Sequence, residues 1–473
     1  MNKQQFGFTL LFFLLFSLKI HAAGPITVAI AEFKTQGGSD DKVWLGSSCS
    51  EEVIDIIAND HTVRVVERQY LNKIIDEVKL QNSGVFDESS AVETGKLLGA
   101  QYFVFGTVTL LNENIKIRCR IVSVTTGAVI GSADVLGNAN NLFQLESELA
   151  QKLTATFKVG SSLMQSSAKA TSDLSNISLG TYSKIDKLKS QCEGFPLFGM
   201  DPARTRKAAE YQVIINTCDE VISLYPKLYL AYFYKTQVLI QQENFPEAEA
   251  AIKIAKSLNA NDVNVLLCLA NLYLAQQDDT KALELLSFLS NKFPEDARIW
   301  YGIAKVQASA LNNHASIEAC INALRFTPKI PQAEKLLQTV LGGMQDLSAT
   351  QFFTPDAYTF AKFYKNYFDF GPANKTTNEL AKQVTLLWPD LYLPYYVQGV
   401  FQAKSGKDEL ALAFFTDGLK YNNSYPYLHR EMGKLLIENK NCKQGKLHLI
   451  IYMKTENSID DYNEIQKYLN KCK

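Results

Sequence analysis

Apolar positions in residues 25–157 alternate between strand-like and helix-like spacing. The run from Ile26 to Phe33 is apolar almost throughout, which is typical of a central strand covered on both faces. Leu71, Ile75 and Val78 fall on one side of a helix. The pattern therefore predicts an α/β domain. Its expected elements are strands over 26–33, 63–66, 102–110, 114–124 and 128–136, and helices over 43–59, 68–81, 90–99 and 141–157.

The strand expected over 114–124 has two chemically different faces. One carries Ile115, Ile117, Cys119 and Ile121, and the other carries Lys116, Arg118 and Arg120. The apolar face must be packed against other elements. The charged face is either solvated or forms an interface with a partner or a second subunit.

A fixed interval of 34 residues runs through the second half of the chain. Pro294 and Pro328 are separated by this interval. Mostly small residues recur with it twelve positions before each boundary, in the set Ile214, Ala248, Ala282, Ser316. Positions where two helices approach closely recur five before it, in the set Val221, Ala255, Leu289, Ala323. Such a period indicates helix–turn–helix units stacked into a solenoid.

These positions resemble the tetratricopeptide repeat family. Trp300, Ile303 and Ala304 fit the first helix of one unit, and Ala323 and Pro328 fit its second. The resemblance implies an all-α solenoid whose inner groove binds extended segments of other proteins. Equivalent groove positions, with positions one turn away, are Gln237, Asn271, Lys305, Asn264, Arg298 and Tyr301. Their amide and cationic groups can bind a peptide backbone and a carboxylate, or can line a hydrated groove without a dedicated ligand.

The repeats divide into two arrays, expected at 196–341 and 356–473, with a capping helix over 460–473. The period slips around Gly342-Gly343 and residues 350–355, which indicates a degenerate repeat or a hinge. Before the repeats, a stretch rich in Ser, Ala and Thr predicts a linker at 158–195 that includes a short helix over 182–190.

An aromatic cluster follows the slip, made of Phe352, Phe353, Tyr358, Phe360, Phe363, Tyr364, Tyr367 and Phe368. At helical spacing these side chains are expected to form core between stacked helices. A docking patch is the alternative.

The N-terminal domain, expected at 25–157, resembles the curli-secretion-channel (CsgG) family and its flagellar outer-membrane relatives. The matching residues, in order, are Val65-Val66-Glu67-Arg68, Leu71, Ile75, Glu77, Gly95 to Ala100, Gly106 and Thr125-Thr126-Gly127. The resemblance implies a mixed sheet flanked by helices on the periplasmic side of the outer membrane.

The chain departs from the channel members of that family in two ways. It lacks the N-terminal lipidated Cys, and a tight turn between the strands ending at Leu111 and starting at Asn114 leaves no room for pore-forming hairpins. Charges such as Arg118 facing lipid would each cost several kcal/mol at mid-bilayer. We therefore do not expect this protein to form a pore as the channel members of the family do.

Residues 1–22 predict a secretory signal peptide. Lys3 precedes an apolar run from Phe8 to Leu18, and small residues follow at Ala22-Ala23. A short membrane anchor is the alternative. No second run of spanning length follows, so the expected product is periplasmic, without a transmembrane segment after signal removal.

Composition excludes some partners and permits disulfides. Lys+Arg number 48 against 49 Asp+Glu, which gives no long-range field to attract nucleic acid. The 8 cysteines lack metal-binding spacing. Cys218 and Cys320 are expected to be buried thiols, whereas Cys442 and Cys472 flank the last helices and could pair.

No active site is evident. The sequence contains no HExxH, GxSxG or phosphate-loop motif, so no catalytic residue, cofactor or metal is expected. We expect an exported, non-catalytic adaptor that binds protein or peptide partners and can form a homo-oligomer through its N-terminal domain. The alternatives are an oligomeric secretion component closer to the curli channel, and an enzyme whose site is assembled from distant residues.

Overall fold

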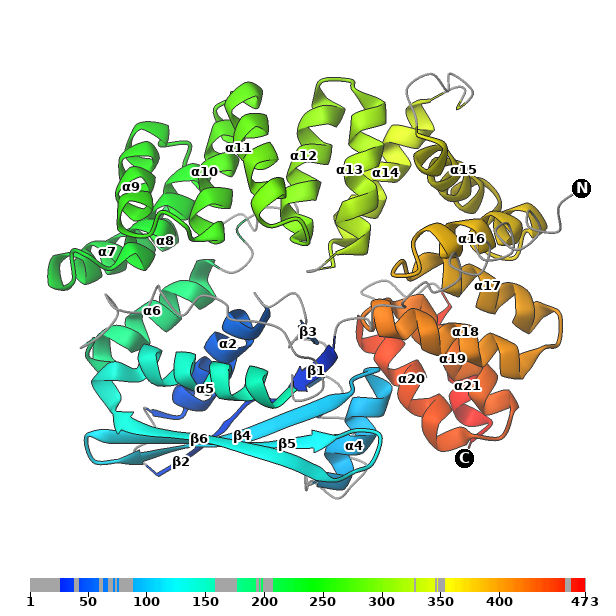
Figure 1. The fold of residues 1–473 in the computed structure, drawn as a ribbon, viewed down its shortest axis with the longest axis horizontal. Helices are drawn as coiled ribbons and strands as arrows, with labels where there is room; N and C mark the ends of the chain where they lie inside the picture. The colour runs from blue at the N-terminus through cyan, green and yellow to red at the C-terminus, as the bar shows by residue number, and fades with distance from the viewer. Residues whose placement is uncertain are drawn as a thin grey trace, which may run out of the picture.

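The computed structural model describes two regions that agree with the expected fold class, an α/β domain and an all-α repeat array (Figure 1). The signal segment and the start of the linker lie outside the described residues, as does most of the expected helix 68–81. The described residues are 26–37, 42–58, 63–66, 71–72, 75, 88–157, 177–192, 195, 197–198, 207–326, 329–344, 347, 354–455 and 461–472. Among them, no helix is long and apolar enough to cross a membrane.

The N-terminal domain is built on a mixed sheet with the order β3-β1-β4-β5-β6, in which β2 also pairs with β4. Its strands are β1 (Ile26–Ile30), β2 (Lys34–Gln36), β3 (Val63–Val65), β4 (Tyr102–Leu111), β5 (Asn114–Ser123) and β6 (Val129–Asn138). Strands β1 to β4 pair in parallel, and β4, β5 and β6 form an antiparallel meander. Strand β2 was not predicted, because three residues carry no detectable period.

Helices α2 (Trp44–Ala58) and α5 (Leu142–Phe157) cover one face of the sheet (Figure 1). They pack on the apolar side of β5, where Ile115, Ile117, Cys119 and Ile121 are fully buried. The alternation of β5 therefore predicts the packed face correctly. Helix α4 (Glu88–Leu97) contributes to a second core on the opposite face, together with Ala29, Ala31 and Phe103. It begins two residues before the expected capping residue Ser90.

Close packing explains several glycines of the family-like pattern. A Cβ atom at Gly95 would lie 2.3 Å from Val124 Cγ2. At Gly106 it would lie 2.7 Å from the Arg118 carbonyl oxygen and 3.0 Å from Phe33 Cδ1. Gly99 has φ +62° and follows α4, a backbone conformation that favours glycine.

The repeat array follows α6 (Leu179–Cys192) and α7 (Ala208–Leu224). Its helix pairs are α8 (Tyr229–Gln241) with α9 (Phe245–Leu258), α10 (Val263–Ala275) with α11 (Asp279–Lys292), α12 (Ala297–Ser309) with α13 (Asn313–Arg325), α15 (Pro355–Phe370) with α16 (Lys375–Leu387), α17 (Leu393–Lys404) with α18 (Asp408–Tyr421), and α19 (Pro426–Glu438) with α20 (Cys442–Thr455). Helix α21 (Tyr462–Asn470) ends the chain. First helices of neighbouring pairs, such as α8 with α10 and α17 with α19, contact each other.

A single helix, α14 (Pro331–Gly343), accounts for the slip in the period. It stands between α13 and α15 without a second helix of its own among the described residues. One hydrophobic core runs through this point, from Leu266 in α10 to Leu435 in α19. The aromatic cluster is mostly core as expected, since Phe360, Phe363 and Tyr364 are fully buried within it. Phe352 and Phe353 lie outside the described residues.

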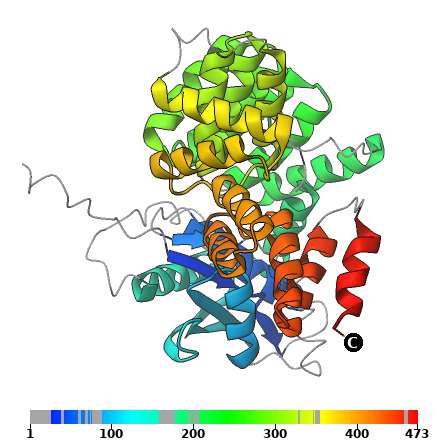
Figure 2. The same ribbon diagram turned by 90° about the vertical axis from the view of Figure 1, so that its right-hand side faces the viewer.

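The array starts and ends on the N-terminal domain, so that it arches over the sheet (Figures 1 and 2). At its start, Tyr182 of α6 packs on Trp44 of α2 and Phe143 of α5. The core under α2 and α5 continues without a break into α6, α7 and α8. Lys189 of α6 also forms an ion pair of 2.5 Å with Asp55 of α2.

At its end, the array contacts the other side of the same domain. Leu447 and Ile451 of α20 belong to the core of α4. The Arg64 Nη1 group of β3 donates a hydrogen bond of 2.6 Å to the Lys420 carbonyl oxygen. Asn423 Nδ2 donates one of 3.1 Å to the Leu98 carbonyl oxygen.

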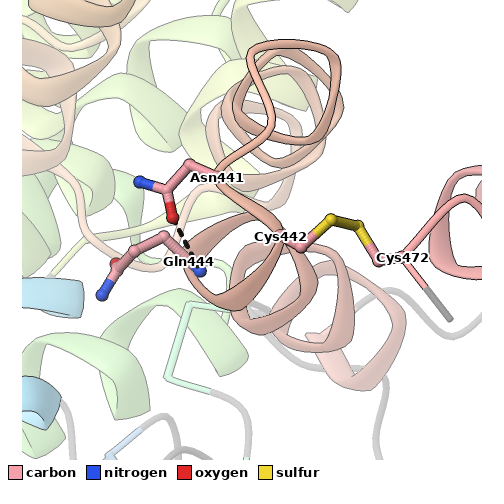
Figure 3. The surroundings of a disulfide bond; sticks show 4 residues. All are labelled: Asn441, Cys442, Gln444 and Cys472. Atoms are coloured by element: carbon pink, nitrogen blue, oxygen red, sulfur yellow. Dashed lines mark hydrogen bonds between the residues drawn. A yellow bond between two sulfur atoms is a disulfide. The ribbon is translucent and has the colours of Figure 1, made fainter.

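The last two helices are joined covalently. Cys442, the first residue of α20, forms a disulfide with Cys472, just after α21 (Figure 3). The other six cysteines form no disulfide and are buried, including Cys218 and Cys320 as expected. A loop of 30 residues closed in this way stabilises the folded chain by about 3–4 kcal/mol in the chain-entropy account. The disulfide therefore links α21 covalently to α20, the helix that contacts the N-terminal domain.

Substitution of Gly106 by Ala should destabilise the N-terminal domain by about 1–3 kcal/mol, because the added methyl group has no space beside Phe33. Gly180→Ala in α6 is the matched control, since the nearest atom to its Cβ is 4.0 Å away and Ala favours helix. Urea unfolding followed by circular dichroism compares the two. Equal midpoints for Gly106→Ala and wild type would contradict this packing argument.

Candidate functional site

The six expected groove residues lie on the first helices of three successive repeats, α8, α10 and α12. Two of them meet directly across a repeat boundary. Arg298 Nη1 donates a hydrogen bond of 2.7 Å to Asn264 Oδ1, although the two residues are 34 positions apart. This contact agrees with the repeat register from which both residues were selected.

Arg298 also connects the array electrostatically to the N-terminal domain. Its guanidinium forms an ion pair of 2.6 Å with Asp296. Burial lowers the pKa of Arg298, but Asp296 first, and then Asp55 of α2 and Asp262, raise it above its ordinary value. Arg298, near the start of α12, therefore lies within electrostatic reach of the N-terminal domain. We call the side of α8, α10 and α12 that carries the six expected groove residues the inner face.

Arg64 in β3 is a charge of the N-terminal domain that lies within electrostatic reach of the repeat array. Burial lowers the pKa of Arg64, and Asp390, Tyr421 and Glu295 oppose that shift. Asp390 and Glu295 belong to different repeats, on either side of the single helix α14. The loops before α12 and α17 thus bring carboxylates within electrostatic reach of the domain.

A stretch of the protein's own chain is seated on the inner face. Phe198 lies between α6 and α7 and is only 3% exposed, within the core of the repeats. Its backbone N–H donates a hydrogen bond of 2.9 Å to Oδ1 of Asn271, one of the expected groove residues. Leu197 packs against the same core. We refer to Leu197 and Phe198 as the seated segment.

Gly302 of α12 provides the space for the phenyl ring. A Cβ atom at this position would lie 2.9 Å from Phe198 Cε2 and 3.1 Å from Leu286. Burial of a phenyl ring contributes about 1.5–3 kcal/mol. Phe198 nevertheless has φ 53°, a left-handed conformation that costs a bulky residue about 1–2 kcal/mol. The net stabilisation from seating this residue is therefore small.

The remaining expected groove residues are Tyr301, Gln237 and Lys305. Tyr301 is buried, and burial raises its pKa. Gln237 Oε1 is buried without a hydrogen-bond partner. Lys305 is half-buried on α12. The structure thus joins Asn264 to Arg298 and Asn271 to the seated segment, but it does not bring all six side chains into one cluster.

The charged face of β5 is open to solvent in part. Arg118 and Arg120 are exposed and Lys116 is half-buried. In the register with β6, Lys116 is opposite Leu136, an exposed apolar side chain. A role of this face as an interface stays a prediction.

Two histidines meet where the array returns to the domain. Nδ1 of His429 in α19 and Nδ1 of His448 in α20 are 2.8 Å apart, and His429 Nε2 donates to the Asn423 carbonyl oxygen at 2.9 Å. His429 Nδ1 must then accept, and His448 Nδ1–H must donate. Burial lowers the pKa of His429 to about 4. Burial, followed by His429, lowers that of His448 well below its ordinary value.

A buried carboxyl group lies at the other end of the array. Tyr182 Oη donates to both oxygens of Glu146, at 2.8 and 2.7 Å, in a fully buried site. Burial, and then the charge of Glu52, raises the pKa of Glu146. Among the described residues, no group of three or more His, Cys, Asp or Glu side chains could hold a metal ion. We read Glu146 and Tyr182 as the polar centre of the contact between α5 and α6.

With this geometry in place, comparison with known proteins supports the resemblance of the first domain. Residues 21–119 match the family model described as the curli production assembly/transport component CsgG. The matched stretch runs from before β1 into β5. The chain therefore carries a CsgG family domain at its N-terminal end. No curated protein matches the sequence.

Solved structures similar to parts of the chain fall into two groups. The LpoB C-terminal domain from Salmonella enterica is 17% identical, with a TM-score of 0.20, over 25% of this chain and 87% of that chain. A PelC dodecamer from Paraburkholderia phytofirmans is 16% identical, with a TM-score of 0.19, over 28% of this chain and 87% of that chain. A tetratricopeptide repeat protein from Parabacteroides merdae is 13% identical, with a TM-score of 0.27, over 62% of this chain and 99% of that chain. The helix pairs and their 34-residue register establish the repeat architecture independently of these low scores.

The seated segment is the feature of the inner face that the sequence pattern did not predict. The composition predicts a linker up to residue 195, and the 34-residue period predicts repeats from residue 196. A signal was present, because Phe195, Leu197 and Phe198 place three large apolar side chains within four residues of a polar stretch. Such a group requires burial, and no periodic element surrounds it.

Acidification is expected to destabilise the junction through the histidine pair. The folded protein keeps His429 neutral, whereas the unfolded chain takes up a proton near pH 6.5. Stability is therefore complete above that pH and is lost as the pH falls toward about 4, by about 3 kcal/mol for His429 alone. Burial raises the pKa of Glu52 to about 7, which has the opposite pH dependence.

The measurement is the difference in Tm between wild type and the double variant His429→Gln, His448→Gln, taken from about pH 7.5 to about pH 4.5. Glu52 is present in both proteins, so its effect cancels. The advantage of wild type should shrink or reverse at the acidic end. A difference that stays constant with pH would rule out titration of this pair.

Proposed function

We propose that this protein is an exported, non-catalytic adaptor of the bacterial envelope that binds protein or peptide partners through the inner face of its repeats. Its N-terminal domain would dock on the periplasmic side of the outer membrane or on an envelope assembly. The CsgG family match supports the envelope assignment, because that family's description is a curli assembly/transport component. The residues that precede the domain fit an export signal.

The observation that carries the proposal is the hydrogen bond between Asn271 and the backbone N–H of Phe198. A backbone contact of this kind depends little on the side chain of the ligand, and it is how an amide ladder holds extended polypeptide. Arg298 and Asn264 lie on the same helices and can receive a carboxylate. The inner face therefore has groups that can bind a polypeptide backbone and a carboxylate.

Site-specific photo-crosslinking in cells tests this function. A photoreactive phenylalanine analogue replaces Lys305 on the inner face of α12, or Lys256 on α9, where the side chain is exposed. We expect discrete cross-linked envelope proteins from the Lys305 position and none of them from the Lys256 position. In pull-downs, Lys305→Glu should lower recovery of those proteins by about tenfold, the effect of one lost charged contact, whereas Lys256→Glu should not. Identical products from both positions, or no product from either, would argue against the adaptor role.

A further inference from the structure

The seated segment follows a residue that packs on a different core. Phe195 is half-buried against the core that α2 and α5 share with α6, α7 and α8, with its ring 6.2 Å from that of Tyr211 in α7. Phe198, three residues later, belongs to the core of the repeats. The chain therefore passes from one core to the other within this short distance, and its second aromatic side chain ends on the inner face.

The contacts of Phe198 are those of a bound ligand more than those of a repeat. It belongs to no helix, and it precedes the helix pairs that carry the 34-residue period. One side-chain amide, that of Asn271, holds its backbone, and one glycine, Gly302, makes room for its ring. The left-handed backbone of Phe198 is a strained conformation that the surroundings impose.

We propose that the seated segment is a resident ligand of the inner face, and that the partner is a polypeptide segment with an aromatic anchor that displaces it. The inference rests on the proposed function and names its partner class. An aromatic side chain on the partner would fill the space over Gly302, and its backbone N–H would bond to Asn271.

The resident segment is tethered, so its effective concentration at the inner face is on the order of millimolar. A free peptide of the same sequence must compete with it and should bind weakly. When Phe198 loses its ring, the competition ends and the inner face becomes available. The occupied state of the full chain is therefore a low-affinity state for partners.

Binding of a fluorescent peptide with the sequence of residues 193–199 to the full chain tests the inference. Phe198→Ala should bind this peptide at least about tenfold more tightly than wild type. Phe288→Ala, which removes an exposed phenyl group from α11, should bind it as wild type does. Adding Asn271→Ala to Phe198→Ala should weaken binding by about tenfold, because the backbone hydrogen bond is lost.

A measurement on the unmodified protein covers the case in which Phe198→Ala fails to fold. Excess peptide should accelerate chymotrypsin cleavage after Phe198, because displacement increases the population in which this bond is accessible. A peptide in which the residue matching Phe198 is Ala should not. Folded Phe198→Ala with no gain in affinity, or cleavage unaffected by peptide, would overturn the inference.

The outcomes separate this inference from the adaptor role. If Phe198→Ala binds the peptide but no envelope protein is cross-linked, the seated segment is a resident ligand and the proposed adaptor function is wrong. If partners are cross-linked at Lys305 but the peptide changes neither binding nor cleavage, the adaptor function is supported and the seated segment is not a resident ligand.

Discussion

The architecture depends on one constraint, that both ends of the repeat array are held by the same small sheet domain. A solenoid exposes an apolar face at each end, which must be capped. Here the first end shares its core with α2 and α5, and the last end places Leu447 and Ile451 in the core of α4. The domain therefore acts as the cap for both ends. The disulfide and α21 cover the side of α20 that faces away from it.

This double attachment determines what the inner face can contact. Arg298 lies within electrostatic reach of Asp55, and Arg64 within that of Asp390 and Glu295, so opposite charges of the array and the domain attract each other across the interior. A partner must enter between these two halves or displace what lies there. The seated segment already covers part of the inner face, so that part is not freely accessible.

Elements that carry a periodic pattern of apolar residues could be predicted from the sequence, and elements or contacts without such a pattern could not. Alternation in β5 identified its buried face, and the 34-residue register placed Asn264 beside Arg298. The single helix α14 and the short strand β2 carry no period that distinguishes them. Contacts such as Arg64 with Lys420 join residues 356 positions apart, and no local pattern encodes them. Closure of the array onto the domain was therefore outside what the sequence could reveal.

The glycines of the family-like pattern illustrate the same limit. Their order along the chain identified the domain, but only the structure explains why each is glycine. Gly106 lies against Phe33, and Gly99 is close to the Leu419 carbonyl oxygen of the last repeats. Gly99, one of the glycines that match the CsgG family, thus also lies at the junction between the last repeats and the N-terminal domain.

Carbodiimide cross-linking of the full chain tests this closure most directly, because it joins only amines and carboxylates in contact. Lys443 and Glu93 form an ion pair of 3.0 Å across the closing junction, and Lys189 and Asp55 form one of 2.5 Å at the first junction. The account predicts both cross-links by peptide mass spectrometry, with Glu93→Gln abolishing only the first. Detection of the Lys189–Asp55 product without any Lys443–Glu93 product would show that the array is attached at one end alone, and would contradict the account.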